Sequence, residues 1–204
     1  MIYLIITTTI NNRFGIINYE ERKNRYLDCI PYVLNFTDET IKPIVVENNG
    51  EQDTYLNAIK CDVVYTNNNK YDLYHKGMNE LLDIKHIIEK YNIQDNDFII
   101  KLTGRYKVCS SHFFDIVKEN CNTYDAFVKF FNVATLEYMH YDCVLGLFAI
   151  KCKYIKRFEY SIETPKSMEC QFAEFVRANV ENIMEIQNLN MECCFADKND
   201  ILHV

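Results

Sequence analysis

Short apolar runs alternate along the first 120 residues with longer stretches in which apolar residues recur at helical spacing. The apolar and β-branched runs, each followed by polar residues, predict strands within residues 2–8, 44–46, 63–65 and 98–100. The longer stretches predict helices over residues 20–36, 54–60, 76–91 and 110–120. Alternation of this kind favours right-handed crossovers and a mostly parallel sheet.

The second half of the chain continues the pattern less regularly. It predicts strands over residues 125–132, 144–151 and 183–186 and a helix over residues 166–179. In the first half, Pro31 is expected to bend its helix or end it early, and Ser110 or Ser111 can cap the helix that follows them. Because no repeat, linker or low-complexity tract interrupts the pattern, we expect a single α/β domain over residues 1–204, with a mostly parallel central sheet flanked by helices.

Charge and cysteine usage narrow the class of partner. The formal net charge of -7 and the pI near 5.3 argue against a general nucleic-acid binder, because phosphate backbones require clustered Lys and Arg. The nine cysteines form no CxxC pair and no Cys/His cluster with zinc-ligand spacing, which favours reduced thiols over a disulfide framework. The first apolar run is too short for a signal peptide or a membrane span. We expect a cytoplasmic protein with no transmembrane segment.

The polar residues that follow the predicted strands carry the main functional signal. In an open parallel sheet, ligands bind outside the carboxyl ends of the strands. The four strand tips are therefore expected at one edge, and they consist of residues 7–9, 47–49, 67–69 and 101–105. Their hydroxyls, amides and carboxylate suit a base and a ribose, and their cations suit a diphosphate. The alternative for any single tip is an ordinary turn in a protein rich in Asn.

The helix over residues 76–91 adds a cation and a small residue at its start. Lys76 and Gly77 would lie beside the positive end of the helix dipole, where a diphosphate binds well, although Lys76 is equally compatible with a solvated side chain. Glu80 is one turn further on and is expected to pair with Arg105 or Lys101. The Asp95-Asn96-Asp97 sequence precedes the central strand, at the opposite end from the expected site, and is interpreted as a turn rather than a metal site.

Candidate proton acceptors come from the second half. Asp142 precedes a predicted strand, and Glu169 begins a predicted helix, where the dipole and backbone donors stabilise an ionised carboxylate. The alternative for Glu169 is an acidic residue of an ordinary first helical turn. The sequence contains no GxSxG, Walker or GxGxxG motif, so hydrolase, kinase and dinucleotide-binding functions lack their usual support.

Three segments together resemble the GT-A-fold glycosyltransferases, especially the small nucleotide-diphospho-sugar transferase-like proteins of capsule gene clusters and large DNA viruses. Residues 76–108 are similar to that family's Lys-Gly-x-x-Glu helix and Lys-x-Thr-Gly-Arg-Tyr strand end, residues 142–158 to its strand after the acceptor loop, and residues 168–177 to its helix with an acidic start. The resemblance implies a Rossmann-like GT-A sandwich, with a nucleotide-binding half over 1–108 and an acceptor-side half over 109–204.

The resemblance also implies a role for each matching residue. The nucleoside would be held by Thr8, Thr9, Arg13, Glu47, Asn48 and Asn49. The rest of the nucleotide would lie along Asn67, Asn69, Lys76 and Gly77. The diphosphate and the donor sugar would contact Lys101, Thr103, Gly104 and Arg105. Glu169 would be the general base, with Asp142 as the second candidate.

The implied reaction is transfer of a hexose or deoxyhexose from a UDP-, GDP- or dTDP-linked donor to a glycan hydroxyl, with inversion. The family's metal-binding Asp-x-Asp would fall where this chain has residues 101–105, Lys-Leu-Thr-Gly-Arg, so dependence on Mn²⁺ or Mg²⁺ stays open. Two alternatives remain: a catalytically silent nucleotide-sugar- or glycan-binding scaffold, and a sugar nucleotidyltransferase, for which the loop after the first strand lacks the expected Gly-rich basic pattern. A viral origin would place the protein in the host cytoplasm.

Overall fold

The computed structural model describes residues 1–11, 18–50, 55–71, 76–194 and 201–204. Its helices are α1 (Tyr19–Leu34), α2 (Lys76–Lys90), α3 (His112–Asn120), α4 (Cys152–Arg157) and α5 (Met168–Asn179), with 3₁₀ turns at η1 (Tyr55–Ala58) and η2 (Asn68–Lys70). Its strands are β1 (Ile2–Thr8), β2 (Ile41–Glu47), β3 (Asp62–Tyr65), β4 (Phe98–Thr103), β5 (Lys107–Val108), β6 (Ala126–Val128), β7 (Leu147–Lys151), β8 (Ile183–Glu185), β9 (Met191–Cys194) and β10 (Ile201–His203).

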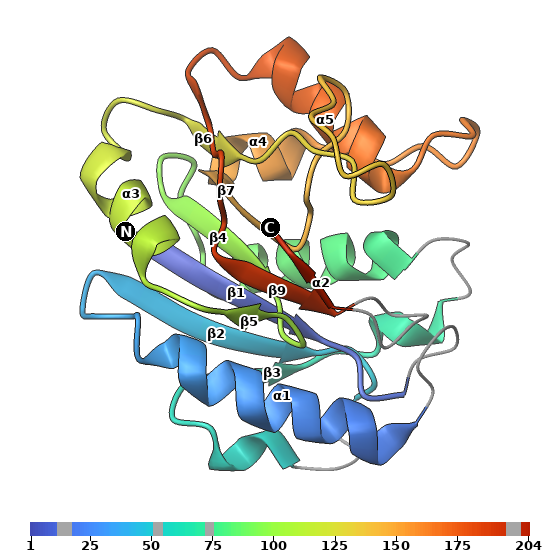
Figure 1. The fold of residues 1–204 in the computed structure, drawn as a ribbon. Coiled ribbons are helices and arrows are strands. Elements are labelled where there is room, and N and C mark those ends of the chain that lie inside the picture. Colours follow the sequence, from blue (N-terminus) through green and yellow to red (C-terminus); the bar gives the residue numbers. More distant parts are fainter. Residues whose placement is uncertain (12–17, 51–54, 72–75, 195–200) are drawn as a thin grey trace.

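A seven-stranded sheet forms the centre of the protein, in the order β3-β2-β1-β4-β7-β6-β8 (Figure 1). The first four strands in this order pair in parallel, β7 runs antiparallel to both of its neighbours, and β6 pairs in parallel with β8. The expected α/β fold, with a mostly parallel central sheet flanked by helices, is confirmed.

Helices cover both faces of this sheet (Figure 1). The side chains of α1 and α3 share one hydrophobic core with alternate residues of β1 and β4, including Leu4 and Ile100. Those of α2, α4 and α5 share a second core with the intervening residues, including Ile5 and Ile99. Because successive side chains of a strand point to opposite faces, each strand contributes to both cores.

A second, three-stranded sheet in the order β10-β9-β5 lies on the α1 side of the molecule. β9 pairs antiparallel with both β5 and β10, so the carboxyl-terminal residues return to the segment that follows the central strand β4. The sequence pattern did not predict these strands, because β5 has two residues and β9 is Met-Glu-Cys-Cys, and such short segments gain their pairing only in the folded chain.

Several predicted elements have different bounds in the structure. α1 continues through Pro31, because Tyr26, Ile30 and Val33 bury one face of the helix on both sides of the proline, and this packing outweighs the lost hydrogen bond. The segment 54–60 forms only the 3₁₀ turn η1 in its described part, and the strands predicted over 125–132 and 144–151 are shorter. Ser111 precedes α3 but its side chain makes no capping hydrogen bond, and α4 was not predicted.

Candidate functional site

The four polar strand tips do lie at one edge of the central sheet. Thr8 is opposite Glu47, Glu47 is opposite Tyr65, and Thr7 is opposite Thr103 in the strand registers. Hydrogen bonds continue the pairing beyond the strands: the backbone N–H of Asn48 donates to the Thr8 carbonyl (3.3 Å), and that of Gly104 donates to the Thr7 carbonyl (2.9 Å). The expectation that topology would bring these segments together is confirmed.

The pleat of the strands nevertheless separates the tip side chains between the two faces. Lys101 and Thr103 alternate with Ile100 and Leu102, so they point to the face that α2, α4 and α5 cover. Glu47 is two residues after Val45 on β2 and therefore points to the same face of the sheet. The Val45 side chain lies in the core on the α1 side. The tips therefore share an edge without facing a single space.

Glu47 is fully engaged inside the protein. Its side chain is buried, and its Oε1 accepts hydrogen bonds from the backbone N–H groups of Ile10 and Asn49, both at 3.1 Å. The Tyr55 hydroxyl donates to its Oε2 (3.1 Å). Burial raises the pKa of Glu47, against the effect of these donors. In this structure Glu47 therefore shapes the loops after β1 and β2.

Asp83, which the sequence pattern did not single out, is a buried carboxylate on α2 that holds the remaining tips together. It accepts hydrogen bonds from Asn48 Nδ2 (3.0 Å), Thr66 Oγ1 (2.6 Å) and Asn68 Nδ2 (2.7 Å). Burial is the main reason that the pKa of Asp83 rises to about 7. The available signal was an aspartate on the apolar side of a helical pattern, four residues after Asn79.

The amide tips also fasten the loop that follows β1. Asn49 Nδ2 and Asn69 Nδ2 both donate to the Asn11 carbonyl, at 3.3 Å and 2.8 Å, and the Asn11 N–H donates to Asn49 Oδ1 (3.0 Å). The Thr8 hydroxyl donates to the Val46 carbonyl (3.0 Å), and the Thr9 N–H donates to the Tyr26 hydroxyl (3.1 Å). These hydrogen bonds fix the positions of the loops at this edge of the sheet relative to one another.

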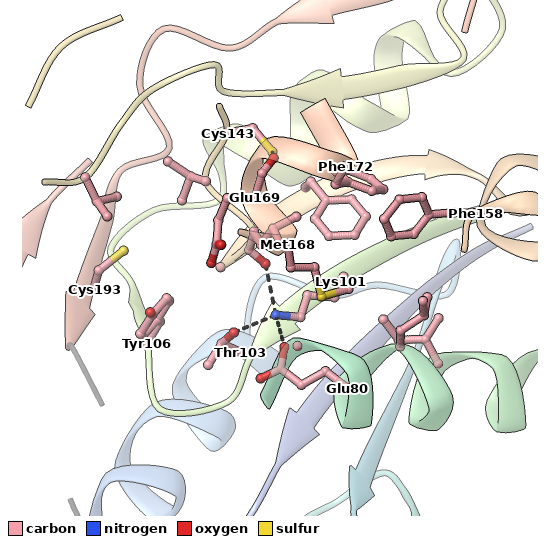
Figure 2. Close-up of a pocket in the computed structure, with 18 of the residues that line it drawn as sticks. Glu80, Lys101, Thr103, Tyr106, Cys143, Phe158, Met168, Glu169, Phe172 and Cys193 are labelled. Atoms are coloured by element: carbon pink, nitrogen blue, oxygen red, sulfur yellow. Dashed lines mark hydrogen bonds and ion pairs between the residues drawn. The ribbon is translucent and has the colours of Figure 1, made fainter. Parts of the chain in front are cut away.

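A cavity of about 320 Å³ opens on the other face of the same edge (Figure 2). Five of the residues predicted to bind or transform substrate contribute to its wall: Gly77, Lys101, Thr103, Arg105 and Glu169. They come from α2, β4, the turn after β4 and α5, and are joined by the segment 143–146 and by Cys193 of β9. The fold thus brings residues from both halves of the chain to one cavity.

Lys101 forms the charged centre of this cavity. Its Nζ lies 2.6 Å from Glu80 Oε2, and it donates hydrogen bonds to Thr103 Oγ1 (2.6 Å) and to the Leu145 carbonyl (2.9 Å). The expectation that Glu80 would pair with Lys101 or Arg105 is confirmed for Lys101. Since an ammonium has three N–H donors, all of them are used within the protein.

Arg105 is held differently, at the wall of the cavity beside Tyr106. Its Nε donates to the Cys194 carbonyl (3.1 Å), and its guanidinium carbon lies 4.9 Å from the centre of the Tyr106 ring. Burial lowers the pKa of Arg105, but the nearby Tyr106, Tyr26 and Glu80 raise it by more. The net pKa of Arg105 is therefore above its ordinary value, and the group keeps its charge. Tyr106 packs directly over Gly146, where an added Cβ would lie 2.3 Å from the ring.

Glu169 presents a carboxylate to the cavity from the first turn of α5 (Figure 2). Ser167 caps this helix by accepting a hydrogen bond from the Cys170 N–H (3.2 Å), which fixes where the turn begins. Within the part of the chain that the structure describes, the Glu169 carboxylate makes no hydrogen bond or ion pair. It is therefore available to a ligand.

Asp142 lies behind this wall rather than in it. Its side chain is buried and accepts hydrogen bonds from Asn132 Nδ2 (2.7 Å) and from the Cys143 N–H (2.8 Å). Burial, the largest cause, raises the pKa of Asp142. Its observed contacts fix the loop that places Cys143 and Val144 in the cavity wall.

Most of the other residues predicted to bind or transform substrate lie outside the cavity wall. The wall of the cavity does not include Thr8, Thr9, Glu47, Asn48, Asn49, Asn67, Asn69 or Asp142. Gly104 also lies outside this wall and packs against β1, where an added Cβ would lie 2.9 Å from Thr8 Cγ2. Lys76 begins α2, but its side chain and the whole of Arg13 lie outside the described residues.

Asp95 and Asp97 precede β4, where Asp95 pairs with Lys156 (2.6 Å) and Asp97 with the amino group of Met1 (2.9 Å). In the described residues, no group of three or more His, Cys, Asp or Glu side chains is placed to hold a metal ion. No helix in those same ranges is long and apolar enough to cross a membrane.

No family model and no curated protein matches this sequence. Several solved structures, in contrast, are similar to this chain. The chain is similar to a protein described as a glucose-1-phosphate thymidylyltransferase from Bacillus anthracis, in complex with sucrose (TM-score 0.59, 11% identity, covering 92% of this chain and 87% of that one). It is also similar to the mannosyltransferase PcManGT from Pyrobaculum calidifontis, in complex with GDP-Man and Mn²⁺ (TM-score 0.59, 9% identity, 92% and 55%).

A third similar structure is the bifunctional IspDF from Campylobacter jejuni (TM-score 0.57, 14% identity, 93% of this chain and 50% of that one). The chain spans about half the length of this protein and of the mannosyltransferase. Identities this low identify the fold alone, and the fold is that of the nucleotide-diphospho-sugar transferases.

Proposed function

We propose that this protein transfers a sugar from a nucleoside-diphosphate sugar to a hydroxyl group of a glycan. One observation carries the proposal: Arg105 and Glu169, whose carboxylate has no partner among the described residues, line the same cavity, at the carboxyl edge of the parallel strands. Transfer requires one positive group for the leaving diphosphate and one acceptor for the proton of the attacking hydroxyl. Residues 1–108 would bind the nucleotide and residues 109–204 the acceptor, within one domain.

Arg105 is the better candidate for the diphosphate, because Lys101 is already neutralised by Glu80. Its planar guanidinium suits two phosphate oxygens at once. The donor would then extend from the cavity along the strand tips, past Gly77 and Gly104 toward Asn49 and Asn69, whose backbones and amides line the same edge. Arg13 and Lys76 would add charge along this path.

Glu169 would accept the proton of the acceptor hydroxyl as that oxygen attacks the anomeric carbon and the diphosphate leaves. A direct displacement of this kind inverts the anomeric configuration. The acceptor would approach along the loop 132–142, which leads into the cavity wall at Val133 and Cys143 and exposes the rings of Tyr138 and Tyr141. Flat exposed rings of this sort can pack against the C–H faces of a sugar.

A sugar nucleotidyltransferase is the second candidate, favoured by the equally high similarity to the thymidylyltransferase structure. That reaction joins a nucleoside triphosphate to a sugar 1-phosphate and releases pyrophosphate. The two reactions are separated by their products, since only the nucleotidyltransferase forms pyrophosphate and only the glycosyltransferase releases a nucleoside diphosphate.

The proposal is tested by binding and turnover with UDP-, GDP- and dTDP-sugars, with and without Mn²⁺. A ligand at a hundred times its dissociation constant adds about 2.7 kcal/mol to the stability of the folded state, which raises the melting temperature by about 5–10 °C for a chain of this size. Arg105→Ala should abolish this shift. Arg177→Ala is the matched control, because Arg177 is also a partly buried arginine but does not line the cavity.

Glu169→Gln separates catalysis from binding. It should leave the melting temperature and nucleotide binding close to those of the wild type, while the transfer rate falls by about 10²- to 10⁴-fold. Full activity of Glu169→Gln would refute its role as the base. Pyrophosphate release from a triphosphate would instead establish the second candidate, and the absence of any nucleotide binding would contradict both.

A further inference from the structure

The cavity has a polar end and an apolar end. The polar end is formed by Thr103, Arg105, Tyr106 and Glu169. The apolar end is formed by Leu81, Ile84, Phe148, Ile155, Phe158 and Phe172. Figure 2 shows Phe158 and Phe172 on the opposite side of Met168 from Tyr106 and Cys193. None of the six side chains of the apolar end has a nitrogen or an oxygen atom.

The apolar end is rigidly built. Phe172 lies between two other rings, with ring centres 4.7 Å from Phe148 and 5.2 Å from Phe158. All three belong to the hydrophobic core that α2, α4 and α5 form with the sheet, and all three are buried. Phe148 lies on β7, Phe172 on α5 and Phe158 directly after α4, and none of the three rings carries a polar group that could face a ligand.

Lys101, which lies between the two ends, offers nothing to a ligand hydroxyl either. Its three donors are used by Glu80, Thr103 and the Leu145 carbonyl. A hydroxyl placed among the six apolar side chains would therefore lose its hydrogen bonds to water and gain none from them in return.

We propose that the apolar end is a subsite for an apolar substituent of the transferred sugar, namely the C6 methyl group of a 6-deoxyhexose. This inference rests on the proposed function. An ordinary hexose carries a hydroxymethyl group at C6, whose hydroxyl would be buried without a partner. An N-acyl group brings an amide N–H and a carbonyl, which would be unpaired in the same way. A methyl group fills apolar space with no polar atom to satisfy.

The test compares donors that differ only at C6. The pairs are GDP-mannose and GDP-6-deoxymannose, dTDP-glucose and dTDP-6-deoxyglucose, and UDP-glucose and UDP-6-deoxyglucose, with the free diphosphates as reference ligands. Dissociation constants are measured by calorimetry. In the series whose diphosphate binds, the 6-deoxy donor should bind about 10- to 100-fold more tightly, the range by which an apolar pocket rejects an added hydroxyl.

Ile84→Thr provides the variant test, because it places a hydroxyl in the apolar end while keeping a β-branched side chain. It should reduce the preference for the 6-deoxy donor several-fold and leave the affinity for the free diphosphate unchanged. Ile87→Thr is the matched control: Ile87 is buried on the same helix but does not line the cavity, so its variant should lose stability without losing the preference.

The outcomes distinguish the two proposals. If a diphosphate binds but its hexose and 6-deoxyhexose donors bind equally, or the hexose binds better, the subsite is refuted while the proposed function stands. An unchanged preference in Ile84→Thr likewise refutes the subsite. If no diphosphate and no nucleotide sugar binds, the proposed function fails and the subsite fails with it.

Discussion

The ion pair between Lys101 and Glu80 allows a quantitative prediction, because its two members differ in burial. The Lys101 side chain is 3% exposed and that of Glu80 is 24% exposed, with 2.6 Å between Nζ and Oε2. Removing one partner of a buried pair costs about 3–5 kcal/mol, because the other charge is left unpaired. Glu80→Gln leaves the more buried charge unpaired but keeps an amide oxygen near Lys101, so we expect a loss of about 2–3 kcal/mol.

Lys101→Met should be less costly, about 1 kcal/mol, although it removes the better-packed residue. Methionine keeps the apolar length of the lysine side chain, and the Glu80 carboxylate that remains can turn toward water. The double variant should cost no more than Lys101→Met alone, since it leaves no unpaired charge. The two effects should therefore be far from additive.

Urea unfolding followed by circular dichroism measures these effects, since the chain contains no Trp for fluorescence. In thermal unfolding followed by the same signal, the melting temperature of Glu80→Gln should fall by about 5–10 °C. Glu174→Gln on α5 is the matched control: it breaks the more exposed pair with Lys166 and should cost less than about 1 kcal/mol. A larger loss in Lys101→Met than in Glu80→Gln, or additive losses in the double variant, would refute the reasoning.

Two further predictions concern positions around the site. Because the pKa of Asp83 is raised to about 7 in the folded state, the folded protein binds one more proton than the unfolded chain between about pH 4 and pH 7. Stability from this group is therefore greatest below pH 4 and falls as pH rises, by at most about 1.4 kcal/mol per pH unit. Asp83→Asn should remove that slope in denaturation curves recorded from pH 4 to 8. It should also stabilise the protein near pH 8, where the new amide of residue 83 can donate to Asn48 Oδ1, which has no hydrogen-bond partner among the described residues. An unchanged slope would contradict the assignment. Gly146→Ala should cost about 1–3 kcal/mol and displace the Tyr106 ring from the cavity, since the added Cβ would lie 2.3 Å from it. Tyr106→Ala should rescue the stability of Gly146→Ala, as a double-mutant cycle would show, and the absence of any coupling would count against this packing.

Much of the fold follows from local pattern. The alternation of short apolar runs with helical stretches was sufficient for the α/β class, for parallel pairing of the first strands and for the shared edge of their tips. The pattern failed where an element is short or where its stability comes from distant partners. β5 and β9 exist because they pair with each other across more than 80 positions of sequence, and α1 runs through Pro31 because its neighbours are buried.

The sequence by itself predicted that the polar strand tips lie at one edge of the sheet, because the β-α alternation favours parallel strands, whose carboxyl ends share an edge. Only the tertiary structure decided which of them share a cavity. Lys101 and Thr103 face the side that α2 and α5 cover, where they line a cavity together with Glu169. Glu47 instead points to the α1 side and is enclosed by backbone donors. The physical reason is that side-chain direction alternates along a strand, while the helices that cover each face are set by long-range packing. Composition and spacing do not encode that packing locally.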